Sequence, residues 1–138
     1  MKLSNILTLP AHYKDRISKV NEVSISNFVL DLEKDQINCS CRASNKYTTR
    51  ISFLDIKEIL SNSPIQVDCN CQSFTFEFAH AVGLDNGLLF PDNFPNLAAK
   101  NKNKYSYLSS CKHLIKFAQF IFHRSVLINN EVNGRLKK

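Results

Sequence analysis

The chain has 138 residues, of which 43% are hydrophobic and 22% are charged, and its formal net charge is +6. This length and composition predict one compact domain and exclude an intrinsically disordered chain. No run of about 20 apolar residues occurs, so a membrane-spanning helix is also excluded, and we expect no membrane partner. The N-terminal residues contain one lysine and a short, interrupted apolar run. They do not fit a signal peptide, and we expect an intracellular protein.

The first half of the chain has the pattern of a small antiparallel sheet. Pro10 can open a short helix that runs to residue 20. Two β-rich segments, residues 26–32 and 36–41, flank a turn-like EKDQ sequence and predict a hairpin. The next elements expected in chain order are a third strand at 46–53, a short helix at 54–62 and an extended segment at 65–69.

Residues 72–110 differ from the rest of the chain. Phe74, Phe76 and Phe78 alternate as in a strand, whereas Phe74, Phe78 and Ala81 could line a helix. The part that follows contains prolines, asparagines and lysines. We interpret the segment as a long excursion loop, of a kind that carries function or needs fastening.

The last predicted element is an amphipathic helix over residues 112–124, which Ser109 or Ser110 can cap. Its apolar face holds Leu114, Phe117, Ala118, Ile121 and Phe122. The predicted fold is therefore α+β, a small antiparallel sheet with a zinc-stapled C-terminal helix and a long excursion loop. We expect a single zinc-binding domain at residues 1–128 and a polar, basic tail at 129–138.

The positive charge is concentrated near the C-terminus. Residues 96–138 contain nine basic residues and one acidic residue, a net charge of +8, whereas residues 1–95 have a net charge of −2. Such a region can bind nucleic acid or an acidic protein surface, or it can serve solubility alone. The candidate nucleic-acid-binding residues are Lys100, Lys102, Lys104 and Arg124.

The cysteines form two close pairs, and a fifth cysteine stands beside a histidine. Cys39 and Cys41 form one Cys-x-Cys pair, Cys69 and Cys71 form the other, and "CKHL" provides a Cys-x-His pair. Cysteines this close seldom adopt relaxed disulfide geometry. Without a secretory signal, such pairs beside a Cys-x-His predict metal ligands.

We expect Cys69, Cys71, Cys111 and His113 to bind one zinc ion, because zinc takes four sulfur or nitrogen ligands in a tetrahedron. For Cys69 and Cys71 to share an ion, the backbone must bend at Asn70. Cys111 and His113 fall at a helix N-terminus, where unpaired amides favour thiolate. The metal would join a strand to this helix and close the 39 residues at 72–110. Because protein would fill all four positions, the site is predicted to be structural and the chain not an enzyme.

Two alternatives remain open at this point. Cys39, Cys41, Cys69 and Cys71 could form a Cys₄ site, with Cys111 and His113 incidental. The five cysteines could also be buried thiols without a metal, since free cysteine packs as a small hydrophobic residue.

The order Cys-x-Cys, spacer, Cys-x-His resembles the SWIM-type zinc finger. The matching residues are Cys69-Asn70-Cys71 and Cys111-Lys112-His113, and "CKHLI" leads into an apolar helix as it commonly does in that family. The resemblance covers about residues 65–125. It departs from the family at Gln72 and Ser73, where a proline–aspartate pair is frequent, but this removes no ligand.

The resemblance implies a module for DNA binding or protein–protein contact. The long spacer of this chain, residues 72–110, and the aromatic run after Cys71 resemble those of small, virion-associated proteins of tailed bacteriophages. It therefore implies a virion structural or assembly protein, located in the host cytoplasm or the virion, whose partners are other virion or assembly proteins. The alternative is a nucleic-acid-binding accessory protein. We expect no small-molecule substrate.

Overall fold

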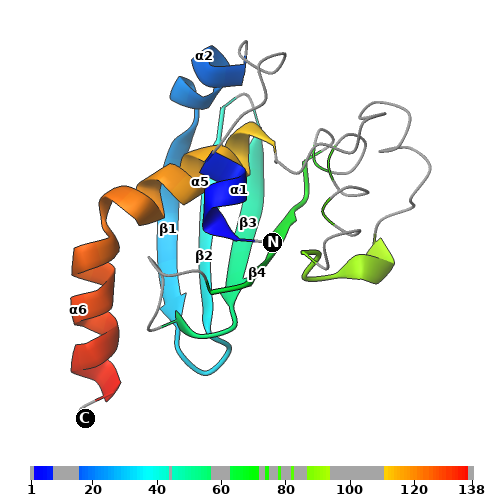
Figure 1. Cartoon of the computed structure of the whole chain (residues 1–138). Coiled ribbons are helices and arrows are strands. Elements are labelled where there is room, and N and C mark those ends of the chain that lie inside the picture. The colour runs from blue at the N-terminus through cyan, green and yellow to red at the C-terminus, as the bar shows by residue number, and fades with distance from the viewer. Residues whose placement is uncertain are drawn as a thin grey trace.

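Four antiparallel strands form a sheet whose order follows the chain, β1-β2-β3-β4 (Figure 1). They are β1 Ser24–Asp31, β2 Gln36–Arg42, β3 Lys46–Phe53 and β4 Ile65–Cys69. Each strand agrees with a segment that the sequence pattern predicted. The computed structural model describes residues 2–7, 16–43, 45–56, 63–71, 74, 78, 82, 87–93 and 111–136.

The predicted hairpin between β1 and β2 is confirmed. Its turn begins after Asp31, whose Oδ1 accepts hydrogen bonds from the amides of Glu33 and Lys34 at 3.1 and 3.2 Å. Asp35 has a φ of 50°, a left-handed conformation that aspartate tolerates better than most residues. The short polar side chains of this turn therefore fix the register in which β1 and β2 pair.

Alternation along the strands gives the sheet one buried face. Ile37, Cys39 and Cys41 of β2 are buried, and the intervening residues are less so. On β3, Ile51 pairs with Ile37, and Thr49 pairs with Cys39. Side chains of paired residues stand on the same side of a sheet, so these residues form the floor of one core.

Segments outside the main ladder also contact the sheet. The amide of Val67 on β4 donates to the carbonyl of Gly87 at 2.7 Å, and Leu89 donates back to Val67 at 3.0 Å. Leu88 thereby forms a parallel bridge with Val67. Part of the predicted excursion loop, residues 87–89, therefore returns to the sheet. At the opposite edge of the sheet, the pairing of β1 with β2 is irregular between Ser26 and Val29.

The predicted C-terminal helix is confirmed as α5, Lys112–His123, which crosses the buried face of the sheet (Figure 1). Two N-terminal helices, α1 Leu3–Leu7 and α2 Arg16–Asn21, pack against it. Four of the five residues predicted for its apolar face are buried, but Phe122 is 49% exposed. The helix turns by about 100° per residue, which carries Phe122 beyond the contact with the sheet. The buried residues are Leu114, Phe117, Ala118 and Ile121.

The chain continues past α5 as a further helix, α6, Ser125–Leu136. The sequence predicted a polar tail from residue 129, so the structure differs from that expectation. Ile128 and Val132, one helical turn apart, are both buried, and they give the helix a narrow apolar stripe that faces the core. The domain boundary at residue 128 stays a prediction.

Other expectations fall partly outside the described residues, including most of the helices predicted at 10–20 and 54–62 and all of 94–110. Phe74, Phe78 and Val82 are helical and fully buried. Their spacing of four residues agrees with the helical alternative for this stretch. A short 3-10 helix, η4, follows at Pro91–Asn93. Within the described part of the chain, no helix has both the length and the apolar character needed to cross a bilayer.

Candidate metal centre

The structure brings Cys69, Cys71, Cys111 and His113 together as a group that could hold a metal ion. Their ligand atoms all lie within 4.8 Å of one another, and all four residues are buried. Cys69 is the last residue of β4, and Cys111 and His113 lie at the start of α5. The cluster therefore joins the end of a strand to the beginning of a helix, as the sequence predicted.

The spacing of Cys69 and His113 is close to that of two ligands in a tetrahedral metal site. A zinc ion with sulfur at about 2.3 Å and nitrogen at about 2.0 Å places two sulfurs about 3.8 Å apart, and a sulfur and a nitrogen about 3.5 Å apart. Cys69 Sγ lies 3.9 Å from His113 Nδ1. Shifts of a few tenths of an ångström would thus suffice for Cys69 and His113 to share an ion.

The bend that the Cys-x-Cys pair needs occurs at Asn70. β4 ends at Cys69, and Asn70 Oδ1 accepts a hydrogen bond of 3.0 Å from the amide of Thr48 on β3. This side chain replaces the backbone carbonyl that a continuing strand would offer. Beyond the bend, Cys71 Sγ accepts a bond of 3.4 Å from the amide of Phe74. Hydrogen bonds from backbone amides therefore fix both the bend at Asn70 and the sulfur of Cys71.

Cys111 is the N-cap residue of α5, with extended φ and ψ of −70° and 165°. Its carbonyl accepts the first helical hydrogen bond, from Ile115 at 3.0 Å. The prediction that Ser109 or Ser110 caps the helix is wrong, because the helix begins directly after Cys111. The unpaired amides and positive end of the helix dipole thus lie beside a sulfur, which favours the thiolate that a metal requires.

His113 presents one ring nitrogen to the sulfurs and packs its ring against Tyr47. The two ring centroids are 4.8 Å apart. Nε2 is buried and has no hydrogen-bond partner among the described residues. A metal bound to Nδ1 would place the ring proton on Nε2. Sequence reasoning missed Tyr47, and only the alternation of β3, which puts it on the same face as Thr49, could have indicated it.

The protonation of the three thiols is strongly coupled. Hydrogen bonds from Cys111 and then Cys69 hold the pKa of Cys71 well below its usual value. The same contacts, with burial, raise the pKa of Cys69, and burial raises that of Cys111. Without a metal, the pocket thus favours a thiolate at Cys71 that accepts hydrogen bonds from the thiols of Cys69 and Cys111. A divalent cation supplies the charge needed to ionise all three, so binding would release protons.

The second Cys-x-Cys pair lies beside this cluster but outside it. Cys39 Sγ is 3.6 Å from Cys41 Sγ and 2.9 Å from Thr49 Oγ1. Thr49 on β3 pairs with Cys39 on one side and Cys69 on the other. Two strand spacings therefore separate Cys39 from Cys69, about 10 Å. This distance does not allow both to bind one ion, and the Cys₄ alternative does not form.

Cys41 nevertheless contacts the backbone of the candidate centre. Its thiol donates to the carbonyl of His113 at 3.7 Å. The hydrogen bond with Cys39 is the largest influence on Cys41 and lowers its pKa to about 7. Cys39 and Cys41 are both buried. They line the sheet face on which His113 rests and belong to the hydrophobic core.

The predicted nucleic-acid-binding residues are not brought together by the described structure. Lys100, Lys102 and Lys104 lie outside the described residues. Arg124 is the C-cap of α5, and its guanidinium carbon lies 3.9 Å from the centroid of the Phe120 ring. Nucleic-acid binding through these residues stays a prediction.

Comparisons with protein-family models, curated proteins and solved structures found no match for this chain. The resemblance to SWIM-type zinc fingers and to tailed-phage proteins thus depends on the Cys-x-Cys and Cys-x-His motifs alone. The arrangement of the four buried donors is an independent observation, because it comes from the fold.

Proposed function

We propose that this chain is a non-catalytic module in which Cys69, Cys71, Cys111 and His113 bind one structural zinc ion. The observation that carries the proposal is the convergence of three cysteines and a histidine from two elements into one buried group. Three thiolates and one imidazole are a donor set that suits zinc, whereas calcium and magnesium take oxygen ligands.

Burial and coordination number both support a structural role. None of the four residues is more than 3% exposed, so a substrate has no direct access to the ion. Four protein ligands complete a tetrahedron and leave no position for water. The contribution of the metal is then to fix the start of α5 to the end of β4, which places α5 across the sheet.

Metal content and cobalt substitution test this proposal. The protein purified from zinc-supplemented cells should contain one equivalent of zinc. After exchange, cobalt should give the thiolate charge-transfer bands and intense d–d bands of a tetrahedral site. Cys69→Ser should lose both signals. Protein that takes up neither ion, or binds cobalt with the weak bands of six oxygen ligands, would refute the proposed centre.

For the biological role, we favour a SWIM-type interaction module that acts as a structural or assembly protein of a tailed phage particle. Its support is the order of the two motifs and the entry of "CKHL" into an apolar helix. Exposed apolar residues near the end of α5 and on α6, Phe122, Val126 and Leu127, are available for protein contact. A virion component predicts a fixed copy number in purified particles. Absence from particles would refute this role and leave the metal proposal intact.

The alternative role is an accessory protein that binds nucleic acid through its basic C-terminal third, which carries a net charge of +8. Phosphate contacts predict an affinity that falls steeply with salt, with a log–log slope of about −0.9 per phosphate. A mobility-shift titration across salt concentrations measures this slope. An absence of binding at low salt would eliminate the alternative.

A further inference from the structure

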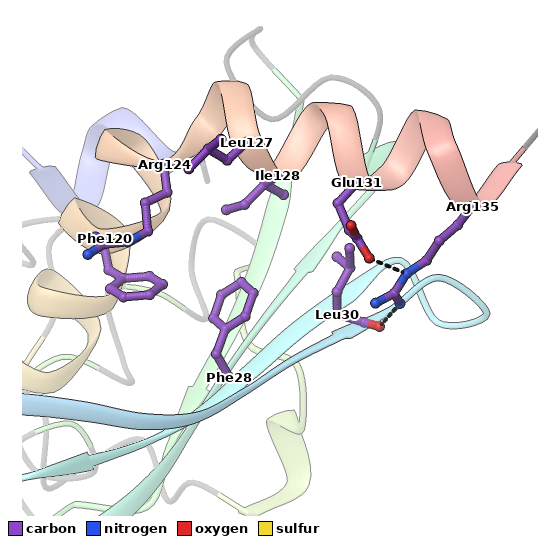
Figure 2. Close-up of a pocket in the computed structure, with 8 residues that line it drawn as sticks. All are labelled: Phe28, Leu30, Phe120, Arg124, Leu127, Ile128, Glu131 and Arg135. Atoms are coloured by element: carbon purple, nitrogen blue, oxygen red, sulfur yellow. Dashed lines mark hydrogen bonds and ion pairs between the residues drawn. The ribbon is translucent and has the colours of Figure 1, made fainter.

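A groove of about 340 Å³ lies between β1 and the helices α5 and α6, away from the candidate metal centre (Figure 2). We call it the α6 groove. Phe28 and Leu30 of β1 form its floor, and Phe120, Leu127 and Ile128 contribute the apolar part of its wall. Its volume falls in the range of pockets that receive ligands or partner side chains. Leu127, at its rim, is 69% exposed.

Three charged side chains also line the α6 groove, and two of them satisfy each other. Arg135 Nε donates to Glu131 Oε1 at 2.9 Å, and its Nη1 donates to the carbonyl of Leu30 at 3.0 Å (Figure 2). Arg124 has no carboxylate partner among the described residues. The groove therefore combines an apolar surface with one guanidinium whose hydrogen-bonding edge is available to an anion.

Aromatic packing fixes the position of Arg124. Its guanidinium carbon lies 3.9 Å from the centroid of the Phe120 ring. The Phe120 ring is 5.3 Å from that of Phe28, which packs edge-on against the buried ring of Phe117 at 6.4 Å. A guanidinium held in this way by cation–π and ring contacts loses less freedom when it binds a carboxylate.

We infer that the α6 groove binds a short segment of a partner protein that carries a large apolar side chain next to an aspartate or glutamate. The apolar side chain covers Phe28, Leu30 and Leu127, and the carboxylate forms a forked hydrogen-bond pair with Arg124. The net charge of +8 over residues 96–138 favours an acidic partner and disfavours a second copy of the same region. Glu131 and the apolar floor make the groove unsuitable for a phosphate backbone.

This inference depends on the proposed role in protein contact and gives the chemistry of the partner. It does not depend on the metal, because no groove residue is among the four proposed ligands. Zinc content is therefore measured on every sample below. Loss of zinc with retained peptide binding would count against the metal proposal alone, and the reverse outcome would count against the α6 groove alone.

The experiment is selection of a displayed library of random dodecapeptides on the immobilised full chain, with the Arg124→Gln variant as the counter-selection. We expect enriched peptides in which leucine, isoleucine or phenylalanine neighbours an acidic residue. Their affinity should fall about tenfold in Arg124→Gln, as expected when a charge-assisted hydrogen bond is lost. Leu127→Ala should weaken the same peptides.

Arg42→Gln is the matched control, since it removes the same charge from an exposed position on β2 outside the groove. Equal losses in Arg42→Gln and Arg124→Gln would overturn the inference, because binding would then follow overall charge. No enrichment, or a consensus without acidic residues, would overturn it as well. A titration with octanoate provides the last arm. If octanoate binds with the same dependence on Arg124 and no peptide is enriched, the occupant is a small amphiphile and the partner-segment inference fails.

Discussion

Replacement of Cys111 by serine should release the metal and detach the start of α5 from β4. Cys111 is fully buried and is the N-cap of α5, so its loss removes the ligand that begins the helix. The remaining donors, Cys69, Cys71 and His113, would lack the fourth ligand that completes a tetrahedron. We therefore expect a large fall in zinc affinity together with a measurable loss of stability.

The size of that loss follows from the segment that the metal closes. Residues 72–110 form a segment of 39 residues between the two halves of the centre. Closing a loop of this length is worth about 4 kcal/mol by the chain-entropy relation. The contact of Leu88 with Val67 already fastens part of the segment, which reduces the figure to about 3.5 kcal/mol for the part beyond it. With an unfolding entropy of about 0.3 kcal/mol/K for this length, Tm should fall by about 10 to 14 °C.

Thermal unfolding with and without a chelator measures this effect. Wild-type protein treated with chelator should lose about as much Tm as Cys111→Ser, and the variant should no longer respond to chelator. If Cys111→Ser does not fold, the comparison of wild-type protein with and without chelator still tests the prediction, because the chelator removes the metal without a mutation. The reasoning is refuted if the chelator leaves the wild-type Tm unchanged, or if Cys111→Ser keeps one equivalent of zinc.

Four further variants test other parts of the structure. Cys39→Ala should keep its metal, measured as zinc per protein, because two strand spacings separate Cys39 from Cys69. Loss of zinc would show that the ligand set is misassigned. Phe117→Ala should lower the free energy of unfolding, measured by chemical denaturation, by about 3 to 5 kcal/mol. Phe122→Ala should change it by only about 0.5 kcal/mol. Similar losses of stability in the two variants would contradict the orientation of α5. Burial raises the pKa of Asp68, although Arg50 at 3.9 Å opposes the shift. A carboxyl group with a raised folded pKa contributes stability at pH values below its unfolded pKa and loses it as the pH rises through the folded pKa. Asp68→Asn should therefore be more stable than wild type at about pH 7.5 and equal to it at about pH 3, as measured by urea midpoints; a less stable variant at neutral pH would show that the ion pair outweighs burial.

The sheet and α5 could be predicted because their signals are local. Alternation with a period of two identifies β2 and β3, and the spacing of Leu114, Phe117 and Ile121 identifies a helix with one apolar face. The helix α6 was not predicted because it lacks such a local signal. Among its described residues the buried apolar side chains are Ile128 and Val132, and the bond from Arg135 to the carbonyl of Leu30 joins residues 105 positions apart. Such a helix is stabilised by tertiary contacts that no sequence window contains.

The four-residue cluster was predictable because each half has a characteristic spacing and the second half precedes a helix. The position of Cys39 and Cys41 was not, although alternation placed both on a buried face. Whether they share an ion with Cys69 depends on which strand lies between them. The order β2-β3-β4 answers that question, and strand order is set by long-range pairing that a single sequence does not reveal.

The two edge strands of the sheet, β1 and β4, have a consequence for how this protein binds partner proteins. Exposed strand margins are templates for added strands and for aggregation, and natural proteins obstruct them with bulges, charges or covering segments. Here Leu88 pairs with the outer side of β4, the irregularity between Ser26 and Val29 interrupts β1, and Arg135 occupies the carbonyl of Leu30. Strand addition is thus obstructed on both sides. We therefore expect a partner to recognise side chains, as proposed for the α6 groove, and we expect edge-to-edge self-association to be disfavoured.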